Sequence, residues 1–199
     1  MKTKLLLIGT ALGFAFLLGR ISAQGFEPSC VMCQADYISA AELKRYEEVA
    51  IATGAIDQQV RSIDIGRSNV QVAMARRGAL PARANRVAEH DLVTEVYIIL
   101  SGSGTLLTSP ELINAAQRPA DYPAVMTLNG PGKNASDALN PKIDELTAGD
   151  VVVIPAGTGH EFTHIEDHIT YLMVRVDPDK VVPLMNREDS EHYLMEQQN

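Results

Sequence analysis

The chain has 199 residues, of which 46% are hydrophobic and 21% charged, and it contains no Trp. This composition is typical of a globular protein and excludes collagen-like, disordered and polytopic membrane chains. The formal net charge of -8 argues against a nucleic-acid partner and against attraction to an anionic membrane surface, because both interactions need clustered Lys and Arg. At this length we expect one domain with a substantial core.

The first residues have the pattern of a secretory signal peptide. Lys2 and Lys4 precede an apolar run from Leu5 to Leu18, and Ala23 is the small residue at the expected cleavage position. An uncleaved N-terminal anchor is the alternative. Cleavage after Ala23 would remove three basic residues and no acidic one, which changes the net charge from -8 to -11. We therefore expect a periplasmic or secreted protein without stable membrane insertion after cleavage.

The two cysteines, Cys30 and Cys33, would pair in an oxidising compartment. Thioredoxin-like redox chemistry would need this pair between a strand and the start of a helix, whereas it lies in an expected N-terminal tail. Haem attachment would need His after the second cysteine, and Gln34 stands there. A local disulfide is the favoured interpretation, and redox function is the alternative.

A helix is predicted from about Ser39 to Ala52, within a tail-and-helix region of residues 24–56. Ser39 and Glu42 have the spacing of a capping box, and apolar residues recur at helical intervals until Gly54.

From residue 57 the apolar period changes to two, which predicts β-strands. The segments with this pattern are 63–65, 70–74, 93–100, 105–108, 151–154 and 169–176. We expect 105–108 to return as the hairpin partner of 93–100 after the Gly-rich residues 101–104, and Glu166-Asp167 to form a turn. Short strands with Gly-rich turns predict an antiparallel double-sheet sandwich or barrel over residues 57–184.

Residues 109–145 differ, because they contain five prolines and show little periodicity. A connection of this length is typical of a functional lid or a flexible insertion. After it, a short C-terminal helix is predicted within residues 185–199, with Tyr193 and Leu194 attaching it to the barrel.

Two segments of the strand region carry regularly spaced histidine, acidic, glycine and proline residues. They read His90-x4-Glu95-x6-Gly102 and Gly149-x5-Pro155-x-Gly157-x2-His160. These spacings resemble the two motifs of the cupin superfamily, and the resemblance covers residues 69–177. It implies an all-β, double-sheet jelly-roll barrel, here with an N-terminal helix and a short C-terminal helix.

The resemblance also implies that His90, Glu95 and His160 point into the barrel and bind one divalent metal ion. Two imidazoles and one carboxylate form a facial triad that leaves coordination positions open, and iron, manganese and zinc are the candidate metals. Ala88 replaces the first histidine of the family motif. His164 replaces its closing Asn, and we expect it to be a fourth ligand or to hydrogen-bond a ligand.

Strand alternation supports the inward direction of Glu95 and places Tyr97 on the same face. A bulge that turned Glu89 or Asp91 inward would instead give a more acidic site suited to Mn(II). The expected pocket or catalytic side chains are Tyr97, Phe162 and Arg175.

The favoured function is metal-dependent action on a small organic molecule, which includes oxygenase-like chemistry. A metal-free binding module is one alternative, and an isomerase or epimerase with His90 or His160 as base and Tyr97 as acid is another. The outward apolar residues would need a cover, so the predicted helix and a second copy of the chain are expected to shield them. These residues are Val96, Ile98, Leu100, Leu172, Val174 and Val176.

Overall fold

The computed structural model describes residues 27–197, and the chain divides into two units, Met1–Val31 and Met32–Asn199. The predicted signal peptide and its cleavage position lie outside the described residues. Cys30 and Cys33 are both disulfide-bonded. Among residues 27–197, no helix is both long and apolar enough to span a membrane.

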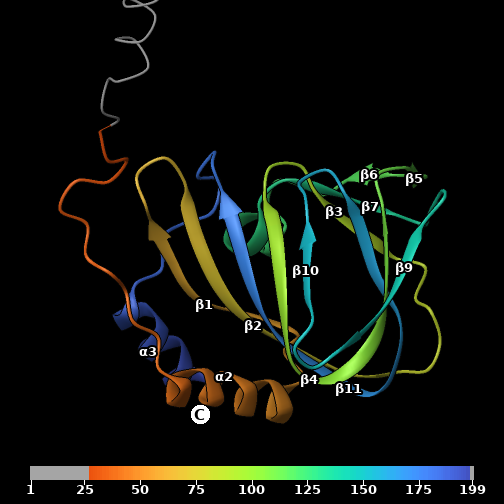
Figure 1. Ribbon diagram of the computed structural model, residues 1–199, viewed down its shortest axis with the longest axis horizontal. Coiled ribbons are helices and arrows are strands. Elements are labelled where there is room, and N and C mark those ends of the chain that lie inside the picture. Colours follow the sequence, from red (N-terminus) through yellow and green to blue (C-terminus); the bar gives the residue numbers. More distant parts are fainter. Residues whose placement is uncertain (1–26, 198–199) are drawn as a thin grey trace, which may run out of the picture. The chain divides into compact units, whose positions relative to one another are not determined.

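Antiparallel strands are the main elements of the second unit, with one α-helix before them and one after them (Figure 1). The elements in chain order are α2 (Ala40–Thr53), β1 (Asp57–Asp64), β2 (Asn69–Leu80), β3 (Val87–His90), β4 (Thr94–Ser109), β5 (Leu112–Ile113), β6 (Ala116–Gln117), the π-helix η1 (Val125–Asn129), β7 (Gly132–Ala135), β8 (Asp137–Ala138), β9 (Lys142–Thr147), β10 (Val151–Ile154), β11 (Gly159–Asp177) and α3 (Arg187–Glu196).

The two longest strands, β4 and β11, pair with each other and run through both sheets. One end of this pair lies beside β2 and β10, with β1 next to β2. The other end lies beside β3 and β9, with β7 and β6 continuing from β3. Two antiparallel layers result, and they enclose a core of aromatic and aliphatic side chains that includes Tyr97, Phe162 and Tyr171. The all-β double-sheet barrel predicted from the strand periodicity is therefore confirmed.

The hairpin predicted at residues 101–104 is wrong, because β4 continues without reversal from Thr94 to Ser109. Gly102 has a φ of 73°, and a Cβ atom at this position would lie 1.9 Å from the carbonyl oxygen of His168. Glycine thus lets the strand bend closely against β11 and pass from one sheet into the other.

The turn predicted at Glu166-Asp167 is also wrong, since β11 is continuous from Gly159 to Asp177. The register of β11 against β4 shifts between His164 and Ile169, so the two acidic residues lie in a bulge rather than a chain reversal.

Residues 109–145 are neither a separate lid nor an unstructured insertion. β7 pairs with β3, β9 pairs with β4, and β5 pairs with β8. The sequence showed little periodicity here because most of these strands are short and the prolines lie between them. The segment therefore builds part of the second sheet, directly beside the strand that ends at His90.

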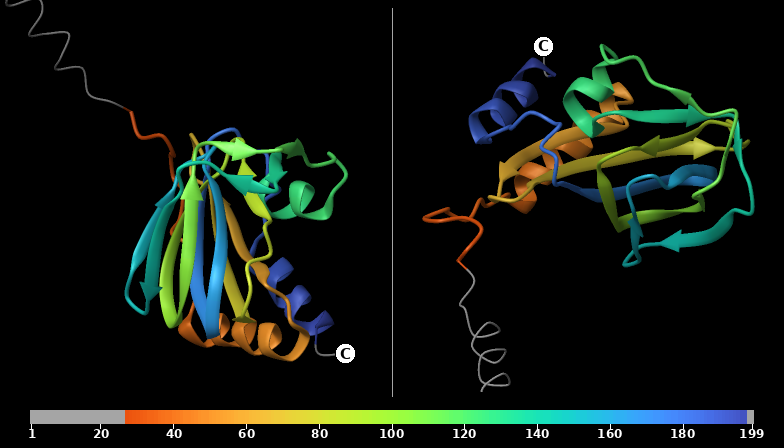
Figure 2. Two further views of the ribbon diagram at one scale, coloured as in Figure 1. Left: turned by 90° about the vertical axis from the view of Figure 1, so that its right-hand side faces the viewer. Right: turned by 90° about the horizontal axis from the view of Figure 1, so that it is seen from above.

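The N-terminal helix forms as predicted and covers the outer face of β1 and β2, lying crosswise to the strands (Figure 2). Tyr46 and Val49 pack there against Met74, and Leu172 joins the same cluster. Ser39 caps the helix by accepting a hydrogen bond from the backbone N–H of Glu42. The capping box is not reciprocal, because the Glu42 carboxylate pairs with Arg61.

The C-terminal helix α3 also forms, and Asn186 caps its N-terminus. Leu194 is completely buried, and the ring of Tyr193 stacks on Tyr46 of α2 with centroids 5.6 Å apart. The two predicted anchors thus attach α3 to the layer that α2 covers.

Candidate metal centre

Three strand ends bring the predicted ligands together. His90 is the last residue of β3, Glu95 is the second residue of β4, and His160 is the second residue of β11. The turn before β11 is tied to the end of β3 by a hydrogen bond from the Gly157 N–H to the carbonyl oxygen of His90, 2.8 Å long. Backbone hydrogen bonds therefore join the two motif segments directly. In the same region, Ala88 of β3 pairs with His160 of β11.

The side chains of His90, Glu95 and His160 form one buried cluster in which the potential ligand atoms all lie within 4.8 Å of one another. Nε2 of His90 lies 3.4 Å from Oε1 of Glu95, and Nε2 of His160 lies 3.5 Å from Oε2. The ring centroids of the two histidines are 5.2 Å apart. Each imidazole thus faces a different oxygen of one carboxylate.

The other ring nitrogen of each histidine fixes its tautomer. Nδ1 of His160 lies 3.2 Å from the carbonyl oxygen of Thr158, which can only accept, so Nδ1 carries the proton and Nε2 keeps its lone pair. Nδ1 of His90 lies 3.0 Å from Nη2 of Arg118, which can only donate. In the neutral ring, Nδ1 of His90 is then the acceptor and Nε2 carries the proton, directed at Glu95.

Glu95 is 2% exposed, and both of its oxygens accept hydrogen bonds. Arg175 donates to Oε1 at 3.0 Å, and the hydroxyl of Tyr97 donates to Oε2 at 2.9 Å. Arg175 also pairs with Asp57. Burial alone would raise the pKa of Glu95, but His90, Arg175 and His160 outweigh burial and lower this pKa to about 2. The carboxylate is therefore ionised at neutral pH.

Both histidines are neutral at the same pH. Burial lowers the pKa of His90 to about 3, although the nearby Glu95 opposes this shift. Burial also lowers the pKa of His160, with Glu95 and the Thr158 carbonyl acting in the opposite direction. Neutral imidazoles and an ionised carboxylate are the protonation states in which these side chains bind metals.

Two of the three side chains, His160 and Glu95, already have the protonation state and direction that a ligand of a divalent metal ion needs. His160 presents a lone pair into the cluster while its Nδ1–H is held by a carbonyl, which is the usual support of a ligating histidine. Glu95 supplies an ionised oxygen. His90 fits only if Arg118 withdraws its N–H from Nδ1, because ligation through Nε2 moves the proton to Nδ1. The buried His/Glu/His cluster suggests a metal ion, and the ligand types do not select iron, manganese or zinc.

A small cavity of about 90 Å³ lies beside the cluster. His90, Glu95, Tyr97 and His160 line it, together with Ala88, which stands where the family motif has its first histidine. The rest of the wall includes Asp57, Arg77, Arg118 and Asn129.

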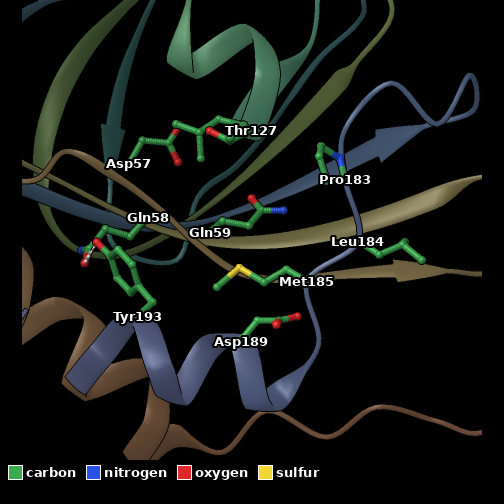
Figure 3. Close-up of a pocket in the computed structure, with 10 residues that line it drawn as sticks. Asp57, Gln58, Gln59, Thr127, Pro183, Leu184, Met185, Asp189 and Tyr193 are labelled. Atoms are coloured by element: carbon green, nitrogen blue, oxygen red, sulfur yellow. Dashed lines mark hydrogen bonds between the residues drawn. The ribbon is translucent and has the colours of Figure 1, made fainter. Parts of the chain in front are cut away.

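A second, larger cavity of about 400 Å³ lies between η1 and α3, away from the histidines (Figure 3). Its wall includes Gln59, Thr127, Met185 and Tyr193. Asp57 lines both cavities, and its carboxylate pairs with the same Arg175 that holds Glu95. Paired charged side chains, from Glu95 through Arg175 to Asp57, thus connect the cluster to the larger cavity.

Of the predicted pocket residues, Tyr97 lines the small cavity, whereas Phe162 and Arg175 are not among its wall residues. Tyr97 and Arg175 contact Glu95, and the ring of Phe162 stacks on Tyr97 with centroids 6.4 Å apart. His164 is exposed, so the expectation of a fourth ligand or a partner of a ligand is wrong. The register shift between Phe162 and His164 turns it outward.

The alternative bulge, which would turn Glu89 or Asp91 toward the metal site, is likewise not formed. Glu89 is buried, but its carboxylate and that of Asp91 both pair with Lys133 of β7. Neither carboxylate belongs to the His90–Glu95–His160 cluster.

Three residues near the cluster had no signal in the sequence. Arg118 lies in the Pro-rich segment that lacked periodicity, Arg77 is one of two adjacent arginines near the end of β2, and Asp57 begins β1. Only the pairing of β7 with β3 and of β2 with β11 brings these arginines to the cavity.

Comparisons with known proteins found remote likenesses among solved structures. No family model and no curated protein matches the chain. Among solved structures, a Bacillus halodurans protein has a TM-score of 0.42 at 14% identity and covers 78% of this chain and 89% of its own. A cupin protein from Bacteroides fragilis has a TM-score of 0.36 at 17% identity and covers 78% of this chain and 93% of its own. A Cupin 2 conserved barrel domain protein from Salinispora arenicola has a TM-score of 0.35 at 13% identity and covers 70% of this chain and 82% of its own.

These likenesses are remote and concern the fold alone. The double-sheet barrel brings both sequence motifs together at its buried histidines.

Proposed function

We propose that this protein is a cupin that binds one divalent metal ion through His90, Glu95 and His160 and acts on a small organic molecule. The observation that carries the proposal is the convergence of the three donors. Their ligand atoms lie within 4.8 Å of one another, in a barrel interior where the carboxylate is ionised and both imidazoles are neutral.

The residues of the chain have separable roles in this proposal. His160 would bind first, because its lone pair already points into the cluster. Arg175 orients Glu95 and balances its charge, and Tyr97 holds the second carboxylate oxygen. A bound divalent ion would supply Lewis-acid polarisation of a substrate oxygen. The aromatic side chains of the core keep bulk water away from the cluster.

The decisive experiment is elemental analysis of the protein purified without chelators. We expect about one metal ion per chain in the wild type and a large loss in His160→Ala. His164→Ala is the matched control, because this histidine is four residues away on the same strand but exposed. Equal, near-zero metal in wild type and His160→Ala would refute the metal site.

The opposite tautomers of the two histidines favour metal-free acid–base chemistry as a second candidate. In this form His160 offers a lone pair and His90 offers a proton toward the same space, as an isomerase or epimerase requires. Nitrogen NMR of the metal-free protein would identify these tautomers. A substrate that exchanges a proton with solvent equally well with and without metal would then favour this candidate.

We also propose that the protein is exported and that the signal peptide is cleaved after Ala23. The apolar run behind two lysines and the disulfide-bonded state of Cys30 and Cys33 support this proposal. Mass spectrometry of the protein from cell fractions tests it. A cytoplasmic protein that retains residues 1–23 would contradict it.

A further inference from the structure

The cavity beside the cluster has an unusual charge for so acidic a chain. Its wall contains the carboxylates of Asp57 and Glu95, and both of these are already paired with Arg175. Arg77 and Arg118 also line the cavity, and within residues 27–197 neither of them forms a salt bridge. With Arg175 counted, three guanidinium groups thus accompany the two carboxylates of the wall. The carboxylates of Glu89 and Asp91 also act electrostatically on Arg118, but both pair with Lys133.

Both unpaired arginines are fixed in place by neutral partners. Arg77 donates from Nε to the hydroxyl of Tyr171 at 3.2 Å, and its guanidinium lies 5.5 Å from the centre of the Phe162 ring. Arg118 is 8% exposed and donates from Nη2 to the carbonyl oxygen of Glu89 at 2.6 Å. These contacts orient the two groups without neutralising them.

Arg118 also lacks a full set of acceptors, because its Nε is buried without a hydrogen-bond partner. The side chain of Arg118 lies close to the backbone of residue 132. A Cβ atom at residue 132 would lie 2.2 Å from Nη2 of Arg118, so Gly132 is needed for the guanidinium to lie across the backbone of β3 and β7. An unpaired cation that is buried in this way needs an anion to complete its interactions.

The volume of the cavity limits what that anion can be. About 90 Å³ is roughly three times the share of one water molecule in the liquid, about 30 Å³. A ligand of about three to five non-hydrogen atoms would fill this space. A carboxylate matches both the size and the planar donor geometry of a guanidinium.

We propose that this cavity binds the carboxylate group of a small organic acid through Arg118 and Arg77. The inference rests on the proposed function in one respect, since the bound acid would lie beside the metal held by His90, Glu95 and His160. It names the substrate class of that site as a short carboxylate, or a molecule that ends in one.

Acetate and its neutral isostere acetamide are suitable probes, because they have the same number of non-hydrogen atoms and differ in charge. Binding is measured by NMR titration on the chelator-treated protein, where a carboxylate has no metal to ligate. We expect acetate to bind more tightly than acetamide. Arg118→Gln should weaken acetate binding by at least about tenfold. Arg77→Gln is a second variant with the same expected direction, should the first fail to fold.

Arg187→Gln is the charge-matched control, because Arg187 lies on exposed α3 and pairs with Glu191. It should leave the acetate affinity unchanged. Equal affinities for acetate and acetamide, or an acetate affinity that neither cavity variant lowers, would overturn the inference. The metal content of each preparation is measured separately, so loss of the metal site and loss of the carboxylate site are distinguishable.

Discussion

His90 and His160 face the two oxygens of one carboxylate with opposite tautomers. The difference arises from their outer partners, an arginine for His90 and a backbone carbonyl for His160. Metal binding through both Nε2 atoms therefore needs a rearrangement at His90 only, and Arg118 controls it.

We predict that Arg118→Gln binds metal more tightly than the wild type, by about tenfold. The side-chain oxygen of Gln can accept the Nδ1 proton that His90 must carry as a ligand, and a positive charge near the ion is removed. Titration with Co²⁺ or Zn²⁺ measures the affinity, and Arg187→Gln is the control for the lost charge. The same variant should bind acetate more weakly. Unchanged or weaker metal binding would contradict this role of Arg118.

Glu95→Gln should abolish metal binding and also lower the free energy of unfolding of the metal-free protein. Its partner Arg175 is completely buried and would keep only Asp57 as an acid. Removing one member of a buried ion pair costs about 3–5 kcal/mol, and we expect a loss of about 3 kcal/mol because Asp57 remains. Urea unfolding measures it, with the exposed Glu145→Gln as control. Equal stability of both variants would contradict the prediction.

The metal-free protein should lose stability as the pH falls below about 6.5. The unfolded chain protonates His90 near this pH, whereas the folded chain does so only near pH 3, so the unfolded state binds more protons in between. The free energy of unfolding should fall by up to about 1.4 kcal/mol per pH unit from this histidine. His90→Gln should flatten the profile and the exposed His192→Gln should not. Identical slopes in wild type and His90→Gln would argue against a neutral, buried His90.

Gly102→Ala should destabilise the protein by at least about 2 kcal/mol. Alanine at this positive φ is strained, and its Cβ would collide with the carbonyl oxygen of His168. Gly78→Ala is a matched control on β2, because a Cβ there meets no atom within 4 Å. Thermal unfolding compares the two. Similar melting temperatures would show that β4 does not depend on the bend at Gly102.

The homodimer remains a prediction, and β10 is the place to test it. Val151 and Val153 are 59% and 60% exposed on this strand, which pairs with β4 and with no other strand of residues 27–197. By contrast, Leu172 packs against the cluster that α2 covers. We expect a dimer in sedimentation velocity and a monomer for Val153→Asp, with Ile51→Asp on the exposed face of α2 as control. A wild-type monomer at high concentration would exclude the dimer.

Sequence patterns were sufficient for the barrel, and the motif resemblance was sufficient for the clustering of His90, Glu95 and His160. Alternating apolar residues locate most strands because each has one face in the core, and the fixed spacing from His90 to Glu95 reflects the short turn between β3 and β4. The bends at Gly102 and at Glu166-Asp167 were misread as reversals, since glycine and acidic residues serve equally in a turn and in a bulge.

The outer partners of the histidines could not be predicted in the same way. Arg118 reaches His90 across 28 positions, through pairings among β3, β6 and β7 that are too short to leave a periodic signal. His164 had the right position in the motif but lies just after a register shift, which local sequence does not reveal.

The pairing of β4 with β11 has a consequence for how the protein is made. Glu95 and Arg175 are 80 positions apart, and His90 and His160 join the same cluster from separate strands. Chains dominated by such distant pairings fold slowly, because large loops must close before the contacts that reward them can form. A newly made polypeptide cannot gather these ligands early, so metal uptake would be the last step of maturation, and the compartment in which folding finishes would decide which ion is available.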